Sequence, residues 1–391
     1  MAEGTKRADY FMYFPENYRW SGGMLLGIGS SRYGGGEIGE IDRVGKRLRG
    51  SLGDDEAWFR EWKLMGEHVE RLGDEEDAKG HRLTAAGCYL RACNYYQIGE
   101  RYRQPKDEDA LETYRRAVAS FQKAMTRVSR PKVEVVEIPF EGTSLPAYFV
   151  HAEETTSARP PAVIFFDGLD VTKEIQYFQG VPDLVQRGMS CLIVDGPGNG
   201  ESIRFRGLYL RHDYEKPASA AVDYLQSRPD VDPDRIGIMA VSLGGYYAPR
   251  AAAFEKRLKA CVAWGAIYNY HETWKRRIEK AFATALSVPG DHIKWVMGAE
   301  TFEEALKKLE PFTLEGVARH IECPFLLTHG EADQQVPLED AQNLFNEVGS
   351  SKKTFKMFTI EEGGAQHCQG DNRTLGASYI FDWLADTLQA R

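Results

Sequence analysis

The sequence contains little cysteine. Six cysteines occur among 391 residues, and no two of them form a CxxC pair. Clustered cysteines are the usual sign of a disulfide framework or a zinc site. Several of the six lie in apolar stretches, where a reduced thiol packs as a small hydrophobic side chain. We therefore expect free thiols, no metal or other cofactor, and a reducing, cytoplasmic location.

Long apolar runs and basic clusters are also missing. No stretch approaches the roughly 18 uninterrupted apolar residues needed to cross a membrane, and residues 1–14 show no apolar stretch followed by a cleavage site. The net charge is −9, which disfavours binding to nucleic acid or to an anionic membrane. We expect neither partner, and a small molecule as the substrate.

The N-terminal third of the sequence has a helical pattern. Residues 1–50 are rich in glycine, which disfavours regular structure and predicts an irregular covering loop. Residues 82–102 and 108–128 carry apolar side chains at three- and four-residue spacings, typical of helices. We expect residues 1–130 to form an N-terminal segment and a helical domain. One helix face would present Leu111, Tyr114, Ala117, Phe121 and Met125.

From residue 131 the pattern becomes that of an α/β protein. Residues 132–152 alternate around a Gly-Thr-Ser turn, which predicts a β-hairpin. Short apolar strands separated by helical segments then indicate a mostly parallel, doubly wound sheet. The strands are expected at 161–168, 189–198, 235–242, 258–265 and 323–330. Residues 131–265 and 321–391 would form the two parts of this core, and residues 266–320 an inserted helical cap.

Ser242 lies at a predicted strand-to-helix junction. A nucleophile elbow places its serine on a strained turn, so the residues two before and two after it must be small. Here they are Ala240 and Gly244, where the usual pattern has glycine at both positions. The pentapeptide alone is weak evidence, because a serine at this place could simply cap the helix.

Two later residues complete a possible catalytic triad. Asp333 follows the last of the apolar strands, and His367 lies in a glycine-containing loop after the strand-like segment KTFKMFTI. The chain order Ser, Asp, His is the order expected for an α/β-hydrolase. His367 is the only histidine after Asp333. We predict that Ser242 is the nucleophile, His367 the general base and Asp333 the residue that orients the imidazole.

A serine nucleophile also requires backbone N–H donors for the oxyanion that forms on the substrate. The N–H of Leu243, directly after the nucleophile, is one predicted donor. The second donor should come from the loop after residues 161–166. Leu169 is the first choice there and Gly168 the second.

Other motifs are weaker. Gly196–Gly200 predicts a tight turn at the rim of the site, since Pro197 removes a donor and the spacing does not fit a phosphate loop. His271-Glu272 and Asp291-His292 are interpreted as solvated cap residues rather than metal ligands. Several aromatic residues could line a substrate pocket, although such residues more often belong to a core. The candidates are Tyr95, Tyr268, Tyr270 and Trp274.

With these motifs in view, the chain resembles the 2,6-dihydroxypseudooxynicotine hydrolase family and, more distantly, fungal polyketide-shortening hydrolases of pigment pathways. The resemblance covers most of the chain from about residue 55. Its motifs are GLDVTKE (168–174), DGPGNGE (195–201), SLGGYYA (242–248), HGEADQQVP (329–337) and the pair His367-Cys368. The helical domain together with GLxxTKE is the most specific part. Ala240, the first 50 residues and the cap depart from the family pattern.

The resemblance implies an α/β-hydrolase fold with the triad on Ser242, Asp333 and His367, and a homodimer. It also implies hydrolysis of a carbon–carbon bond next to a ketone, with the substrate held between the N-terminal domain, the cap and the core. A carboxylesterase acting on a small O-acyl substrate would use the same three residues. A lyase or cyclase, or a non-catalytic scaffold on this fold, is a further alternative.

Overall fold

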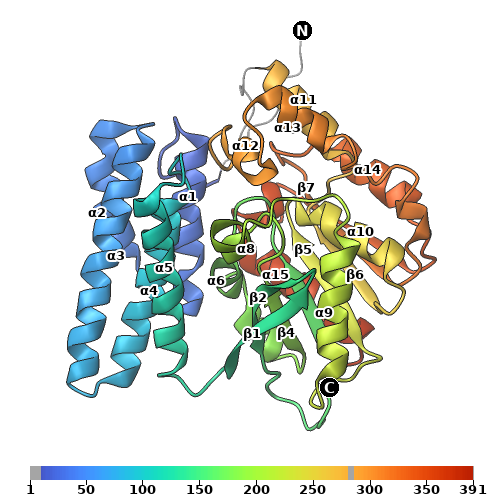
Figure 1. The fold of residues 1–391 in the computed structure, drawn as a ribbon, viewed down its shortest axis with the longest axis horizontal. Helices are drawn as coiled ribbons and strands as arrows, with labels where there is room; N and C mark the ends of the chain where they lie inside the picture. The colour runs from blue at the N-terminus through green and yellow to red at the C-terminus, as the bar shows by residue number, and fades with distance from the viewer. Residues whose placement is uncertain (1–9, 281–285, 391) are drawn as a thin grey trace.

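The computed structural model describes residues 10–280 and 286–390 (Figure 1). The parts of the predicted N-terminal segment and cap at residues 1–9 and 281–285 lie outside these ranges. An eight-stranded sheet runs through the centre in the order β1-β2-β4-β3-β5-β6-β7-β8. The strands are β1 (Val133–Phe140), β2 (Thr143–Val150), β3 (Ala162–Phe166), β4 (Ser190–Val194), β5 (Ile236–Val241), β6 (Ala260–Trp264), β7 (Phe325–Gly330) and β8 (Lys353–Phe358).

The sheet has the predicted mixed topology. β1 pairs with β2, and β2 with β4, in antiparallel fashion, whereas every pairing among β3 to β8 is parallel. Each predicted strand is present, and the hairpin is formed by β1 and β2. The sequence prediction of an α/β-hydrolase fold is therefore confirmed.

Helices cover both faces of the sheet. Side chains alternate between the two faces along each strand, and both faces are apolar, so each must be covered. Ile164 and Phe166 of β3 pack into one apolar cluster, and Val163 and Phe165 into another. The first cluster includes α9 (Glu215–Ser227), α10 (Gly244–Phe254) and α14 (Leu338–Glu347). The second includes α7 (Val181–Val185) and α15 (Arg373–Thr387). These two layers explain why the core strands are apolar throughout.

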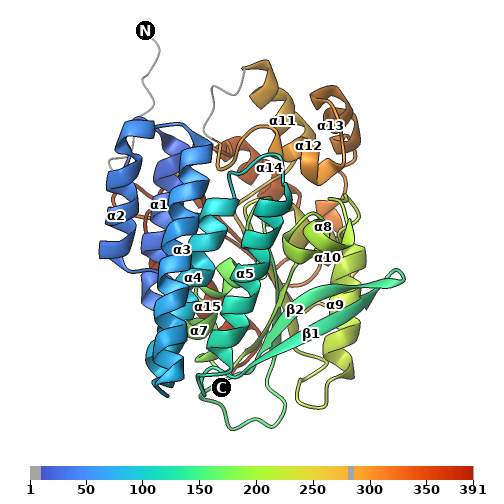
Figure 2. The ribbon, with the colours of Figure 1, turned by 60° about the vertical axis from the view of Figure 1, so that its left-hand side comes forward.

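The N-terminal helices pack beside the sheet as a separate layer (Figure 2). They are α3 (Asp55–Ala78), α4 (Arg82–Glu100) and α5 (Glu108–Met125), with α1 (Tyr18–Gly29) and α2 (Ile38–Leu48) before them. Tyr114, Ala117 and Phe121 of α5 are fully buried, as the helical spacing predicts. None of the helices over the described residues is long and apolar enough to cross a membrane.

The expectation of an irregular segment over residues 1–50 is wrong for its described part, because α1 and α2 are regular helices. Asn17 begins α1 by accepting a hydrogen bond from the backbone N–H of Trp20 at 3.0 Å. The glycines of α1 allow close packing rather than disorder. A Cβ at Gly23 would lie 2.6 Å from the indole ring of Trp58, so only glycine fits beneath that ring.

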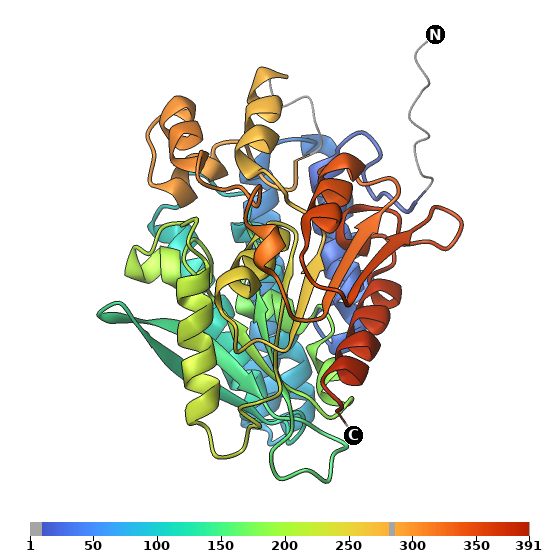
Figure 3. The ribbon, with the colours of Figure 1, turned by 90° about the vertical axis from the view of Figure 1, so that its right-hand side faces the viewer.

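Between β6 and β7 the described residues form three α-helices and the short 3-10 helix η3 (Ala318–His320). The α-helices are α11 (Tyr270–Glu279), α12 (His292–Met297) and α13 (Phe302–Leu309). Figures 1 and 3 show them together beyond one end of the sheet. A helical insertion was predicted at this place from the interruption of the strand pattern.

A buried ion cluster joins the N-terminal helices to the sheet. The Lys173 ammonium, at the start of α6 (Lys173–Tyr177), lies 2.8 Å from Glu174, 2.9 Å from Asp195 and 2.6 Å from Glu201. Tyr114 of α5 donates a long hydrogen bond of 3.4 Å to Glu174. Burial opposes the charge on Lys173, but the carboxylates of Asp195 and Glu174 hold its pKa well above the usual value. The TKE motif therefore has a structural role.

Replacing Lys173 by methionine should lower the free energy of unfolding by about 3–5 kcal/mol, because it leaves buried carboxylates without a counter-charge. Urea unfolding of the variant measures this loss. Lys216→Met is the matched control, since Lys216 pairs with Asp213 at 2.9 Å but is 55% exposed. Its effect should be much smaller. Equal effects of the two substitutions would contradict a stabilising role of the cluster.

Candidate active site

Ser242 lies on a strained turn between β5 and α10. Its φ of +61° is in the left-handed region, which a serine adopts only when its surroundings enforce it. The turn is close-packed: a Cβ at Gly244 would lie 2.5 Å from the Ala240 methyl, and one at Gly245 would lie 2.0 Å from the Gly265 carbonyl oxygen. Alanine is thus accommodated at position 240 because position 244 is glycine. This is the geometry of a nucleophile elbow.

The fold brings Asp333 and His367 to this serine. Asp333 follows β7, and His367 begins the short helix η4 (His367–Gln369) after β8. The Ser242 Oγ lies 2.7 Å from His367 Nε2, and His367 Nδ1 lies 2.7 Å from Asp333 Oδ2. The other oxygen of Asp333 accepts hydrogen bonds from the N–H groups of Gln335 at 2.8 Å and Val336 at 3.0 Å. All three residues predicted from the sequence are therefore joined in one chain of hydrogen bonds.

The electrostatics of the pair favour a charged imidazole. Burial alone would raise the pKa of Asp333, but the charge and hydrogen bond of His367 hold it below its usual value. For His367, burial lowers the pKa, whereas the Asp333 carboxylate opposes this and raises it well above 6.5. An imidazole paired in this way is stabilised as a cation when it accepts the serine proton.

The loop after β3 packs directly against the elbow. A Cβ at Gly168 would lie 2.8 Å from the Val241 carbonyl oxygen and 2.9 Å from the Ser242 Cβ. The Gly168 N–H already donates to the side chain of Asp167 at 2.8 Å. The N–H groups of Leu169 and Leu243 have no acceptor among the described residues. The structure thus favours Leu169 over Gly168 as the partner of Leu243 in a pair of free donors.

Two side chains hold this loop in place. Asn199 donates to the carbonyl oxygens of Gly168 at 2.8 Å and Val171 at 3.2 Å. The Gly196–Gly200 turn therefore supports the loop from behind. It was predicted to lie at the rim of the site, but none of its residues lines the cavity. His292 contacts the Leu169 carbonyl at 3.3 Å through Nε2.

His292 was expected to be a solvated cap residue, and this is wrong. Its side chain is buried, with Nδ1 3.4 Å from the Gln104 amide. Burial, together with the nearby Lys106 ammonium, lowers its pKa to about 3. A neutral ring can donate from Nε2 to Leu169 while Nδ1 accepts from Gln104. The sequence offered no sign of this, because Gln104 lies far away along the chain.

Gly168→Ala should lower kcat by about 100-fold or more, because the added methyl pushes the loop away from the elbow and displaces a donor worth about 3–4 kcal/mol in comparable sites. Steady-state kinetics on a chromogenic ester measures the loss. Gly39→Ala serves as the control, since a Cβ at Gly39 meets nothing within 4 Å. Unchanged kinetics of Gly168→Ala would show that the loop does not supply a donor.

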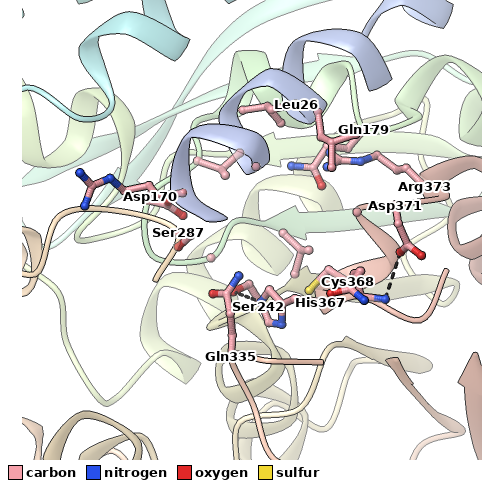
Figure 4. Close-up of a pocket in the computed structure, with 18 of the residues that line it drawn as sticks. Leu26, Asp170, Gln179, Ser242, Ser287, Gln335, His367, Cys368, Asp371 and Arg373 are labelled. Carbon is pink, nitrogen blue, oxygen red and sulfur yellow. Dashed lines mark hydrogen bonds between the residues drawn. The ribbon is translucent and has the colours of Figure 1, made fainter. Parts of the chain in front are cut away.

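A cavity opens above the serine, and the N-terminal helices form part of its wall (Figure 4). Tyr18, Leu25 and Leu26 reach it from α1, and Arg101 and Tyr102 from the end of α4. Ser287, between β6 and β7, contributes from the cap side. The cavity thus lies between N-terminal helices, cap and core. Its polar wall includes Asp167, Asp170, Gln179, Gln335, Gln366, Cys368, Asp371 and Arg373.

The four aromatic candidates do not line this cavity. Tyr95 is buried, and its hydroxyl donates to Glu40 at 2.7 Å. The Tyr268 hydroxyl donates to Glu347 on α14. Tyr270 and Trp274 lie on α11 of the cap, where they are buried in an apolar cluster. Their burial favours a packing role.

The sequence did not indicate that side chains of α1 and of the polar wall line the cavity. Asp170 lies within the GLxxTKE motif, which was a usable signal. Arg373 and Gln179 lie in unremarkable helical or loop segments, so nothing local marked them. Among the described residues, no group of three or more histidine, cysteine or acidic side chains is arranged to hold a metal ion.

Comparison with known proteins identifies the family of this chain. Residues 175–391 match the model of the prolyl oligopeptidase family. The hydrolase acrC of Aspergillus aculeatus is 28% identical, with 97% of this chain and 99% of the relative covered. The 20-hydroxy-prefusarin hydrolase FUS2 of Gibberella moniliformis is 29% identical, with 92% and 94% covered. The hydrolase ORFZ of Pyricularia oryzae is 30% identical, with 77% and 79% covered.

Among solved structures, the crystal structure of the 2,6-dihydroxy-pseudo-oxynicotine hydrolase is similar to this one with a TM-score of 0.76. The two sequences are 27% identical, and the likeness covers 92% of this chain and 95% of the other. The resemblance stated from the motifs is therefore confirmed. It extends through the N-terminal helices, well beyond the region that the family model matches.

Proposed function

This chain belongs to the prolyl oligopeptidase family of α/β-hydrolases, and from that premise we propose that it is a serine hydrolase that cleaves a carbon–carbon bond next to a ketone. The observation that carries the proposal is the Ser242–His367–Asp333 hydrogen-bond chain at the base of a cavity walled by N-terminal helices. The substrate class is an aryl ketone or a polyketide-like small molecule.

The triad supports acyl transfer. In the proposed reaction, His367 Nε2 takes the Ser242 proton as Oγ attacks the substrate carbonyl carbon. The N–H groups of Leu243 and Leu169 then donate to the oxyanion. The tetrahedral intermediate breaks its bond to the leaving group, which receives the proton from His367. A water, deprotonated by His367, attacks the acyl-enzyme and releases the carboxylic acid and free Ser242.

The leaving group decides between the two closest activities. In a carboxylesterase it is an alkoxide, which His367 protonates on oxygen. In the proposed reaction the bond between the carbonyl carbon and its neighbour breaks. The electron pair passes into an adjacent ketone as an enolate, which is then protonated on carbon. The same residues serve both reactions, so the triad alone does not separate them.

The walls of the cavity support the carbon–carbon assignment. The solved structure that is similar over 92% of this chain is named a 2,6-dihydroxy-pseudo-oxynicotine hydrolase, and FUS2 is named a 20-hydroxy-prefusarin hydrolase. Here α1 and the end of α4 supply Tyr18, Leu26 and Tyr102 to the cavity. These side chains form an apolar and aromatic surface, which suits a ring or an unsaturated chain.

A matched pair of substrates tests the bond that is broken. Benzoylacetone carries a 1,3-diketone, and phenacyl acetate differs from it by one inserted ester oxygen. The proposal expects wild-type enzyme to convert benzoylacetone to a methyl or phenyl ketone and a carboxylic acid, identified by mass spectrometry. Turnover of phenacyl acetate alone would instead assign the chain as a carboxylesterase.

Covalent trapping separates a hydrolase from a lyase, a cyclase or a scaffold. A fluorophosphonate probe should label wild-type enzyme at Ser242, and a quenched reaction should show an acyl adduct on the peptide that contains it. Turnover without any adduct would favour a reaction in which His367 acts as a base alone. The absence of both turnover and labelling would favour a non-catalytic role.

A further inference from the structure

Most charged side chains around the cavity have partners within the protein. Arg101 donates through Nε to the Asp170 carboxylate at 2.8 Å, and Arg19 pairs with Asp55 at 2.6 Å. Asp371 is occupied by backbone groups. Its carboxylate accepts hydrogen bonds from the N–H groups of Gly364, Ala365 and Gln366, at 3.1, 3.1 and 3.0 Å. These charged side chains stabilise the walls of the cavity through their partners in the protein, so they are not free to bind a ligand.

Arg373 is different. It is the first residue of α15, and its side chain lines the cavity without a hydrogen bond or ion pair to any described residue. Burial lowers the pKa of its guanidinium, with Arg101 as a further positive neighbour. An arginine nevertheless keeps its charge in a protein. The cavity therefore contains a half-buried cation that has no counter-ion among the described residues.

Asp167, whose carboxyl is close enough to affect the Arg373 pKa, does not form an ion pair with it. Asp167 also lines the cavity and is 1% exposed. Burial raises the pKa of its carboxyl well above the usual value, so the neutral acid is favoured. Its Oδ2 has no hydrogen-bond partner. A neutral Asp167 can donate a hydrogen bond to an anion, and it does not repel one.

Two buried amides of the same cavity lack partners as well. Gln366 is 4% exposed, and neither its amide nitrogen nor its amide oxygen has a hydrogen-bond partner. Gln179 is also 4% exposed, and its side chain forms no hydrogen bond with a described residue. Figure 4 shows Gln179 and Arg373 reaching one part of the cavity, away from Asp170 and Ser287. Buried polar groups are rarely left unpaired, so these amides indicate a place for a polar ligand.

We propose that Arg373, together with Gln179 and Gln366, binds a delocalised oxyanion of the substrate, either a carboxylate or the ionised enol of a 1,3-dicarbonyl group. This inference rests on the proposed function, because it assigns the substrate class of the same cavity. The planar guanidinium offers two parallel N–H groups, which match the two oxygens of such an anion. The substrate would thus carry an acyl group at Ser242 and an anionic group at Arg373.

A series of 4-nitrophenyl half-esters tests the inference. The half-esters of adipic to azelaic acid end in a carboxylate at increasing distance from the scissile bond, and their methyl esters are neutral counterparts. For at least one chain length, wild-type enzyme should prefer the acid over the methyl ester in kcat/KM. In Arg373→Met this preference should fall by about 10- to 100-fold, mainly through KM, since a hydrogen bond to a charged group is lost. Arg373→Lys should retain part of it.

Arg319→Met is the control variant, because Arg319 is 65% exposed and its nearest carboxylate is 3.8 Å away, on Glu347. Its acid-to-methyl-ester ratio should equal that of wild type. Inhibition by monomethyl adipate or by dimedone, a 1,3-dione that is largely ionised at neutral pH, identifies the carboxylate or the enol as the preferred anion. Two results would overturn this inference and leave the proposed function intact. One is hydrolysis without preference for any acid, and the other is an acid-to-methyl-ester ratio in Arg373→Met equal to that of wild type. No turnover of benzoylacetone or of any ester would overturn the proposed function and this inference with it.

Discussion

Ser242→Ala is expected to lower kcat by roughly 10⁴-fold or more, because the variant lacks the atom that forms the acyl-enzyme. The Ser242 Oγ lies 2.7 Å from His367 Nε2, and no other hydroxyl among the described residues forms a hydrogen bond with that nitrogen. The strained turn should persist in the variant, because the close contacts at Gly244 and Gly245 are unchanged. Thermal unfolding should therefore occur within a few degrees of wild type.

Labelling with a fluorophosphonate probe gives an independent measurement of the same prediction. Wild-type enzyme should be labelled, and Ser242→Ala should not. Ser227→Ala is the matched control, since Ser227 is an exposed residue that only donates to the carbonyl oxygen of Tyr224 at 2.7 Å. Retained turnover in Ser242→Ala, with labelling equal to that of Ser227→Ala, would exclude Ser242 as the nucleophile.

The sequence was sufficient to predict the core and to select Ser242, Asp333 and His367 as candidates, because both follow from short local patterns. Buried parallel strands are apolar along their whole length, so their ends could be located to within a few residues. Ser242 and Asp333 lie directly after such strands, and His367 lies after the following one. The parallel sheet brings the ends of these strands to one edge, which converts three separate positions into one site.

The cavity could not be predicted in the same way, because its walls come from segments far apart in the chain. The glycines of residues 1–50 suggested irregular structure, whereas Gly23 serves to bring α1 against Trp58. The aromatic candidates were chosen for their type, and packing buries them elsewhere. Arg373 is distinguished only by the absence of a hydrogen bond or ion pair to any described residue, which becomes visible only after the chain has folded.

Asp333→Asn should lower kcat by about 10³- to 10⁴-fold, nearly as much as loss of the nucleophile. Asp333 Oδ1 accepts two backbone N–H groups, from Gln335 and Val336, which the amide oxygen of asparagine can still accept. The amide nitrogen would then face His367 Nδ1 and donate to it. The imidazole proton would move to Nε2, where it prevents the ring from accepting the proton of Ser242.

The pH dependence of the same pair gives the test. In wild type the Asp333 charge raises the pKa of His367 above 6.5 despite burial, and only the neutral ring accepts a proton. Activity should therefore rise with pH, with the midpoint of kcat/KM above 6.5. In Asp333→Asn the contribution of Asp333 is lost and only Cys368 still opposes burial, so the midpoint of the residual activity should move to lower pH. Glu331→Gln, an exposed change in the same loop, should leave the profile unchanged. An unshifted midpoint in Asp333→Asn would show that Asp333 does not set the protonation of His367.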